Sequence, residues 1–266
     1  MEQSKVIWGI VTYNRTDRQQ MLLYLNSLGY NKDEIIVHCQ TEQDYNTLTE
    51  KYDSKATILY KKGRNVCENK NNLLDWVCSN RPNTKLIICS DKVRGIKFLN
   101  KYGKGTLITK RETLDYMIRR AFLFTERQHG VFFGCYPVQN DFFMKHTISI
   151  NQLVLGCFMG FPNPEAIRFD TEQPLKEDFE IVLRCVNNGL KMVRFNDICL
   201  RATFHTKGGA HELWNADGDK VNEYCTRRIL KKYPNLAKPH ATRKNEIRYT
   251  GKSIVINKSI LYDAIL

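Results

Sequence analysis

Two adjacent carboxylates stand at the start of a predicted helix in the stretch of residues 176–209. Glu177 and Asp178 come directly after Pro174-Leu175, and apolar side chains then recur at helical spacing up to Asn188-Gly189. The helix dipole stabilises an ionised carboxylate at this end, where such a group can accept the proton of a hydroxyl. Acidic residues in the first turn of an ordinary helix give the same pattern, so a catalytic and a purely structural interpretation both stay open.

The segments before this stretch are expected to form a parallel sheet. Short apolar runs at residues 6–11, 35–37, 57–60 and 86–89 alternate with segments of helical pattern. Strands that are apolar throughout are typical of a parallel sheet with helices on both faces. Ligands of such sheets bind at the carboxyl ends of the strands. The residues there are polar and largely basic, as a nucleotide diphosphate requires: Tyr13, Asn14, Arg15, Arg64, Asn65, Ser90, Asp91 and Lys92.

The second half of the chain differs in character from the first. Residues 111–126 have a helical pattern and residues 130–134 a strand pattern, whereas residues 140–161 hold many aromatic and few charged side chains. From Cys225 to Tyr249 the chain is basic, with Glu246 as its single acid. The cations there are candidate phosphate contacts, and a solubility tail is the alternative. They are Arg227, Arg228, Lys231, Lys232, Lys238, Arg243, Lys244 and Arg248.

The charge balance indicates an anionic partner. The 266 residues include 41 Lys and Arg against 28 Asp and Glu, which gives a net charge of +13. A surface of this kind attracts polyanions, with nucleic acid as the first candidate and an anionic membrane or a phosphorylated substrate as alternatives.

The cysteines and the apolar runs favour a cytoplasmic protein. The nine cysteines are scattered singly without any C-x-x-C pair, which argues against a zinc knuckle and for reduced thiols. Neither a signal-peptide pattern nor an apolar run of about 18 residues is found, so no membrane partner is expected.

The order of these motifs resembles that of the GT-A glycosyltransferases, which transfer a sugar from a nucleotide-sugar donor. The chain looks most similar to the phage and base-J-associated DNA glycosyltransferases, which act on hydroxymethylated pyrimidines. In that group the fourth strand typically ends in Asp-Asp-Asp-hydrophobic, and a later block reads Lys-Glu-Asp-aromatic. Here IICSDKVRGIKFL and KEDFEIVLR stand in those places, followed by FHTKGG. The likeness spans roughly residues 6–209.

The resemblance implies a fold and a division of the chain. The fold would be α/β and GT-A-like (Rossmann-like), with a central, mostly parallel sheet flanked by helices. Residues 1–224 would form the glycosyltransferase domain, with a nucleotide-sugar-binding half at 1–105 and an acceptor half at 106–224. Residues 225–266 would be a basic C-terminal extension.

The resemblance also implies roles for individual residues. Glu177 and Asp178 would act on the acceptor hydroxyl, while Asp91 and His205 would hold a metal ion, Mg²⁺ or Mn²⁺. The remaining matched positions would hold the donor: Tyr13, Asn14 and Arg15 at the base and ribose, Arg64 and Asn65 at the ribose or diphosphate, Asp91 at the ribose as the alternative to a metal, and Ser90, Lys92, His205, Lys207 and Gly208, with Gly209, at the phosphates.

One departure puts the metal in question. Ser90-Asp91-Lys92 offers a single carboxylate where the family has two or three, and a hard divalent cation prefers several carboxylate oxygens. We therefore expect Lys92 to replace the cation in part; the alternative is that donor binding has been lost.

The function expected from the resemblance is transfer of a hexose, glucose as the first candidate, from UDP-glucose. The acceptor would be a hydroxymethylated, or already glucosylated, pyrimidine in double-stranded phage DNA, in the cytoplasm of an infected bacterial host. Two alternatives stay open: a GT-A enzyme with a glycan or protein acceptor, and a non-catalytic DNA-binding protein on a degenerate transferase scaffold.

Overall fold

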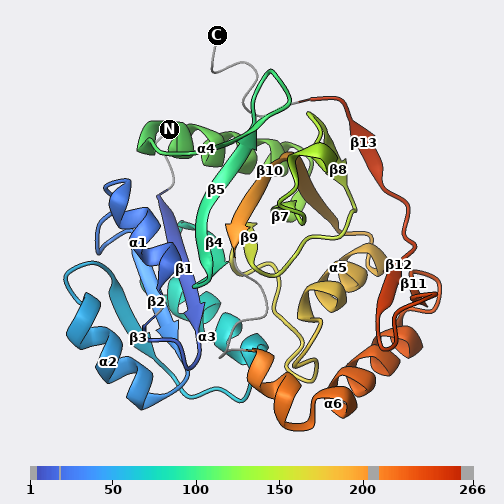
Figure 1. The fold of residues 1–266 in the computed structure, drawn as a ribbon, viewed down its shortest axis with the longest axis horizontal. Coiled ribbons are helices and arrows are strands. Elements are labelled where there is room, and N and C mark those ends of the chain that lie inside the picture. Colours follow the sequence, from blue (N-terminus) through green and yellow to red (C-terminus); the bar gives the residue numbers. More distant parts are fainter. Residues whose placement is uncertain (1–4, 18, 203–209, 259–266) are drawn as a thin grey trace.

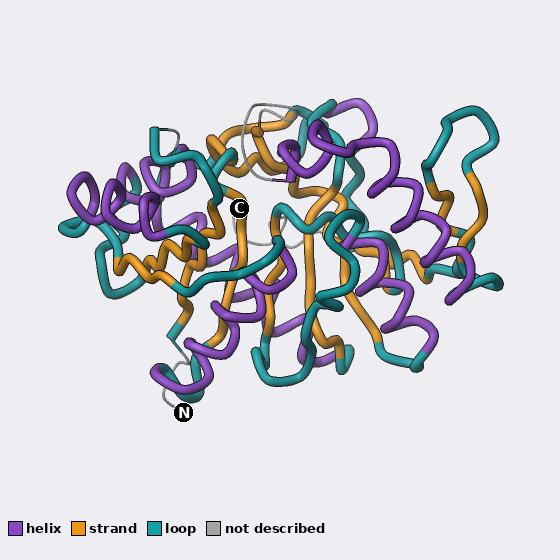
Figure 2. The backbone as a smooth tube through the Cα atoms, turned by 90° about the horizontal axis from the view of Figure 1, so that it is seen from below, coloured by secondary structure: helices purple, strands orange, loops and turns teal. Residues whose placement is uncertain are grey.

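The computed structural model of the chain describes residues 5–17, 19–202 and 210–258. Its centre is an eleven-stranded mixed sheet with the strand order β13-β8-β10-β7-β9-β4-β1-β2-β3, to which β5 and β6 add beside β10 (Figure 1). Helices flank this sheet, as the view from below shows (Figure 2).

The first half of the chain forms the parallel part of the sheet. Its four strands are β1 (Val6–Thr12), β2 (Ile35–Cys39), β3 (Thr57–Tyr60) and β4 (Lys85–Ser90), and β1 pairs in parallel with both β2 and β4. The crossover helices are α1 (Gln20–Ser27), α2 (Glu42–Tyr52) and α3 (Val66–Asn80). The predicted strands are confirmed, and the central residues of β1, β2 and β4 are apolar and buried because helices cover both faces.

The second half extends the sheet with strands of both directions. β9 (Phe158–Phe161) lies antiparallel between β4 and β7 (Gly130–Tyr136), and β10 (Lys191–Ala202) runs parallel to β7. The first part of β10 also pairs with β8 (Ile148–Ile150), and its last part pairs antiparallel with β5 (Val93–Leu99), with Ile198 opposite Phe98. The smaller elements are β6 (Gly105–Leu107), α4 (Arg111–Arg127) and the 3₁₀ turn η1 (Asp141–Phe143).

Two apolar layers hold the sheet, one on each face. α1, α2 and α4 pack on the face that carries Trp8, Phe133 and Phe195. α3 and α5 (Glu177–Asn187) pack on the opposite face, which carries Phe132 and Phe161. The helices thus fix both sides of the strands whose carboxyl ends border the site.

The segment predicted as a basic extension packs on the rest of the chain. α6 (Ala210–Lys232) contains the expected boundary between residues 224 and 225, and the hairpin of β11 (Ala237–Pro239) and β12 (Ile247–Tyr249) follows it. Ile229, Tyr233 and Ile247 are buried against Leu183 of α5. β13 (Ile254–Ile256) then pairs with β8 at the edge of the main sheet.

None of the helices in the described part of the chain combines the length and the apolar character that a membrane crossing requires.

Candidate functional site

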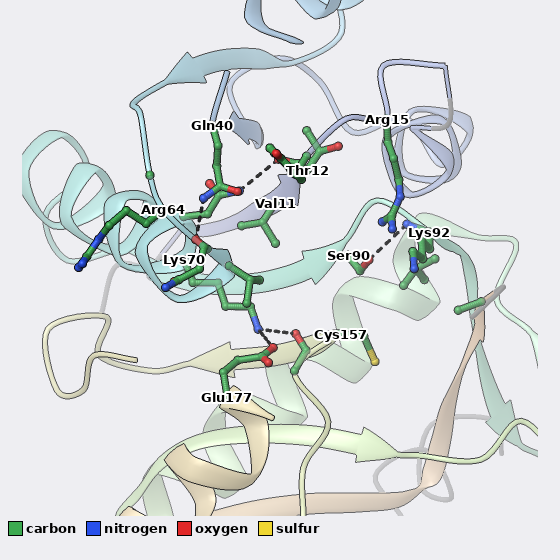
Figure 3. Close-up of a pocket in the computed structure, with 18 residues that line it drawn as sticks. Val11, Thr12, Arg15, Gln40, Arg64, Lys70, Ser90, Lys92, Cys157 and Glu177 are labelled. Carbon is green, nitrogen blue, oxygen red and sulfur yellow. Dashed lines mark hydrogen bonds and ion pairs between the residues drawn. The ribbon is translucent and has the colours of Figure 1, made fainter. Parts of the chain in front are cut away.

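A cavity of about 250 Å³ opens at the carboxyl ends of β1, β2 and β4, beside the first turns of α3 and α5 (Figure 3). Its position agrees with the rule for parallel sheets. Of the residues predicted from the sequence, seven line it: Tyr13, Arg15, Arg64, Asn65, Ser90, Lys92 and Glu177. Side chains that are more than 100 residues apart in the sequence are thereby brought to one place.

The rim formed by α3 and β2 is fixed by hydrogen bonds. The Asn65 side chain caps α3 by accepting hydrogen bonds from the backbone N–H groups of Cys67 and Glu68. The amide of Gln40, at the carboxyl end of β2, donates to the Asn65 carbonyl at 2.6 Å. Arg64 is exposed and pairs with Glu68 one turn along. These contacts hold polar groups around the cavity without filling it.

Asp91 lies beneath the cavity and not in its wall. The side chain is fully buried, with one carboxylate oxygen 2.7 Å from the Thr12 hydroxyl and the other 3.0 Å from the Arg15 guanidinium. Burial raises the pKa of Asp91, and the charge of Arg15 with the hydrogen bonds from Thr12, Arg15 and Ser90 offsets only part of that rise. Asp91 therefore holds Arg15 in place.

A buried lysine that the sequence analysis missed lies on the other side of the cavity. Lys70 of α3 donates to Glu177 at 2.9 Å and to the Gly156 carbonyl at 3.0 Å (Figure 3). Its ammonium also lies over the Phe169 ring. Burial lowers the pKa of Lys70, but the charge and hydrogen bond of Glu177 outweigh it, so the pKa is raised overall. The ammonium is thus kept charged beside Glu177.

Asp178 stands next to this pair and has a perturbed pKa. Its carboxylate accepts hydrogen bonds from the backbone N–H groups of Gly156 and Phe179. Burial, and then the charge of Glu177, raises the pKa of Asp178 to about 6. A carboxylate with a pKa this close to neutrality is suited to accept a proton.

Gly156 lies in the centre of this arrangement. A β-carbon there would come within 2.7 Å of a Glu177 oxygen, 2.8 Å of the Lys70 ammonium and 3.4 Å of Asp178. Any other residue would therefore push the ends of the Glu177 and Lys70 side chains out of their places. Gly156 and its neighbour Cys157 also line the cavity.

The other predicted residues lie elsewhere. Asn14 has a left-handed backbone, with φ of 52°, and its N–H donates to Asp44, so the residue is part of the turn after β1. His205, Lys207, Gly208 and Gly209 lie outside the described residues, and Ala202, which precedes them, lines the cavity.

The carboxylates of the described residues do not form a site for a divalent metal. Among the described residues, no group of three or more His, Cys, Asp or Glu side chains is placed to hold one. Asp91 is engaged by Thr12 and Arg15, and Glu177 by Lys70. Both oxygens of Asp91 are thereby occupied, and Glu177 shares one oxygen with the Lys70 ammonium, so these two carboxylates do not form the set of several oxygen ligands that Mg²⁺ or Mn²⁺ prefers.

The predicted phosphate contacts near the C-terminus fall into two groups. Arg228, which is partly buried, and Lys232, whose side chain is 41% exposed, pair with the acids Asp170 and Glu180. The others project outward: Arg227, Lys231, Lys238, Arg243, Lys244 and Arg248 are exposed. The sequence analysis therefore predicted more cations free to contact phosphate than the structure offers in this segment.

The sequence signals for the missed residues differ in strength. Gln40 and Gly63 follow β2 and β3, and the rule about carboxyl ends would have found both. Lys70 lies in the polar run ENKNN and looks like a solvated lysine, so no local signal marks it.

Comparisons with known proteins bear on the fold. No protein-family model matches the sequence, and no curated protein matches it. Among solved structures, residues 1–349 of TarS from S. aureus match with a TM-score of 0.51 and 15% sequence identity, over 85% of this chain. This chain spans only 65% of that structure. The same fragment in complex with UDP matches with a TM-score of 0.47 and 14% identity, over 85% of this chain and 65% of that one. The chain thus has the α/β, GT-A-like fold that its sequence predicted.

Proposed function

We propose that this protein is a glycosyltransferase that moves a sugar from a nucleotide-sugar donor to an acceptor hydroxyl. The observation that carries the proposal is the charge arrangement of one cavity. Arg15 and Lys92 lie at one end and the carboxylates of Glu177 and Asp178 at or beside the other. Transfer from a sugar diphosphate needs both: positive charge for the leaving group and a base for the incoming hydroxyl.

The donor fits the side of the cavity made by the first half of the chain. Thr12, Tyr13, Gln40 and Asn65 offer hydrogen-bonding groups for a base and ribose, and Arg64 stands at the rim. A UDP-sugar is the donor that we propose, with glucose as the first sugar to test. The GT-A-like fold is compatible with this donor.

The proposed reaction is a displacement at the anomeric carbon. The acceptor oxygen forms a bond to that carbon as its proton passes to the Asp178 carboxylate. The bond from the carbon to the phosphate oxygen breaks, and the nucleoside diphosphate leaves with the electron pair. Glu177, which is held by Lys70 at 2.9 Å, would orient the hydroxyl.

The acceptor that we propose is a hydroxyl on an anionic phosphodiester polymer, with DNA that contains hydroxymethylated pyrimidines as the first candidate. The net charge of +13 and the exposed cations on and after α6 support a polyanion. The C5 substituent of such a base projects into the major groove, where an enzyme can reach it.

Mass spectrometry of the acceptor tests the proposal. The protein is incubated with UDP-glucose and DNA that contains hydroxymethylcytosine, hydroxymethyluracil or glucosylated hydroxymethylcytosine. The DNA is then digested to nucleosides, and their masses are measured. A hexose increment that Asp178→Asn abolishes is the expected result. Transfer to a glycan or protein but not to DNA would keep the enzyme class and change the acceptor. Salt-sensitive DNA binding without transfer from any UDP-sugar would overturn the enzymatic proposal.

A further inference from the structure

We infer that Arg15 and Lys92, and not a divalent cation, neutralise the diphosphate of the bound nucleotide. This inference rests on the proposed function, because it concerns the donor of that reaction. It assigns to two side chains of this protein the charge that a metal would otherwise supply.

The carboxylates near the cavity are already engaged. Both oxygens of Asp91 accept hydrogen bonds within the described structure, and the Asp91 side chain is only 1% exposed. Glu177 is paired with Lys70. A metal bound at Asp91 would have to displace the buried Arg15 guanidinium or the Thr12 hydroxyl, and a metal bound at Glu177 would stand beside the buried Lys70 ammonium, which repels it.

Arg15 lines the cavity, and its guanidinium is held in one position. Asp91 holds its guanidinium at 3.0 Å, and Gln19, which is fully buried, donates to the Arg15 carbonyl at 2.8 Å and to the Thr12 hydroxyl at 3.1 Å. A guanidinium that is held in one orientation is well suited to bind phosphate, since little side-chain entropy is lost on binding.

Lys92 adds a second cation at the same end of the cavity. The Ser90 hydroxyl accepts the Lys92 backbone N–H, and Figure 3 shows the Arg15 and Lys92 side chains converging beside Ser90. Within the described residues, no carboxylate lies within ion-pair distance of the Lys92 ammonium. Burial, and then the charge of Arg15, lowers the pKa of Lys92, with Asp91 acting in the opposite direction.

Two cations that repel each other at one end of a cavity favour an anion beside them. Arg15, Lys92 and Asp91 together carry a net positive charge, and Asp91 is shielded from the cavity by the groups that it binds. A diphosphate placed there would remove the repulsion and restore the Lys92 pKa toward its usual value. The arrangement would therefore bind the anion without a metal.

Calorimetric titration with UDP, and with uridine as the ligand that lacks phosphates, tests the inference. Each is measured in EDTA and in millimolar MnCl₂, for the unaltered chain and for Lys92→Met. The matched control is Lys62→Met, which removes the same charge from an exposed lysine two residues before Arg64 that does not line the cavity.

The inference predicts UDP affinity that differs less than twofold between EDTA and MnCl₂. Lys92→Met should weaken UDP binding by at least about tenfold, as the loss of a charge-assisted hydrogen bond implies, and should leave uridine binding unchanged. Lys62→Met should leave both unchanged. If Lys92→Met does not fold, the EDTA comparison on the unaltered chain and the charge-conserving Lys92→Arg decide the question.

The possible failures separate the two proposals. UDP binding that appears only with MnCl₂ overturns this inference and leaves the glycosyltransferase proposal standing. Equal loss of UDP and uridine affinity in Lys92→Met also overturns it, since the lysine would then shape the pocket rather than bind phosphate. Absence of UDP binding under every condition overturns the proposed donor, and this inference with it.

Discussion

Replacement of Lys70 by methionine tests the buried ion pair between α3 and α5. Methionine keeps most of the side-chain length and removes the ammonium, so Glu177 is left without its partner. The two charged atoms lie 2.9 Å apart, and with an effective dielectric constant of about 20 their attraction is about 6 kcal/mol. Desolvation of both charges offsets part of it, and loss of one partner from a buried pair costs about 3–5 kcal/mol.

We expect the lower end of this range for Lys70→Met. The Glu177 side chain is 16% exposed and can turn toward water, whereas that of Lys70 is only 2% exposed. A decrease of about 3 kcal/mol in the free energy of unfolding corresponds to a fall in Tm of about 6–12 °C for a chain of this size. Urea unfolding, followed by the fluorescence of the buried Trp8, gives the free energy directly.

The double variant Lys70→Met, Glu177→Gln is the decisive control. It removes both charges, so most of the lost stability should return, with a coupling energy of at least about 1 kcal/mol. If the two single losses simply add in the double variant, the pair does not stabilise the fold and the reasoning is refuted.

The remaining predictions concern pH and surface charge. Asp178→Asn should abolish transfer and yet raise the free energy of unfolding at pH 7 by at most about 3 kcal/mol. The reason is that the pKa of Asp178 in the folded state, about 6, lies above the usual value of 3.8, so the ionised carboxylate opposes folding. The transfer activity of the unaltered chain should fall as the pH drops below about 6. Burial lowers the pKa of His38 from 6.5 to about 4, so between these pH values the unfolded state binds one proton more than the folded state. The free energy of unfolding should therefore fall by about 3 kcal/mol as the pH drops from 6.5 to 4, and His38→Gln should remove this part of the pH dependence. Arg228→Ala should lower the Tm because it breaks the pair with Asp170. Arg227→Ala should leave the Tm unchanged. It should reduce the slope of the logarithm of DNA affinity against the logarithm of salt concentration by about 1.

Each of these outcomes has a clear contrary result. Transfer that survives in Asp178→Asn would exclude this carboxylate as the base. An unchanged acid transition in His38→Gln would mean that another group titrates in that window. If Arg228→Ala and Arg227→Ala weaken DNA binding equally without a change in Tm, the division of the cations into internal and external groups is wrong.

The regular elements of the first half could be predicted because the information is local. The apolar run at residues 57–60 became β3 with the same bounds, and the helix expected at 111–126 became α4 (Arg111–Arg127). Those segments bury both faces of a strand or one face of a helix, and their residue types show this directly. The carboxyl-end rule then indicated the edge of the sheet where the cavity lies and named six of its eighteen lining residues.

The contacts that depend on distant segments could not be predicted in this way. Lys70 is buried because Phe169 and Glu177, about 100 residues later, cover its ammonium. Asp91 looked like a metal ligand because its partner Arg15 lies on another strand end. Arg228 looked available for phosphate because its acid, Asp170, lies outside the basic segment.

The long strand β10 has a consequence for synthesis of the protein. Most residues of β5 are buried in the finished fold, yet Ile198, which pairs with Phe98, is added to the chain 100 residues later. At a typical rate of translation of about 5–20 residues per second, one edge of β5 stays unpaired for roughly 5–20 s until β10 has been synthesised. During that interval β1 to β4 can already pair among themselves, while the open edge of β5 is a site for misassociation between nascent chains. Faster elongation between these two strands should therefore raise the soluble yield.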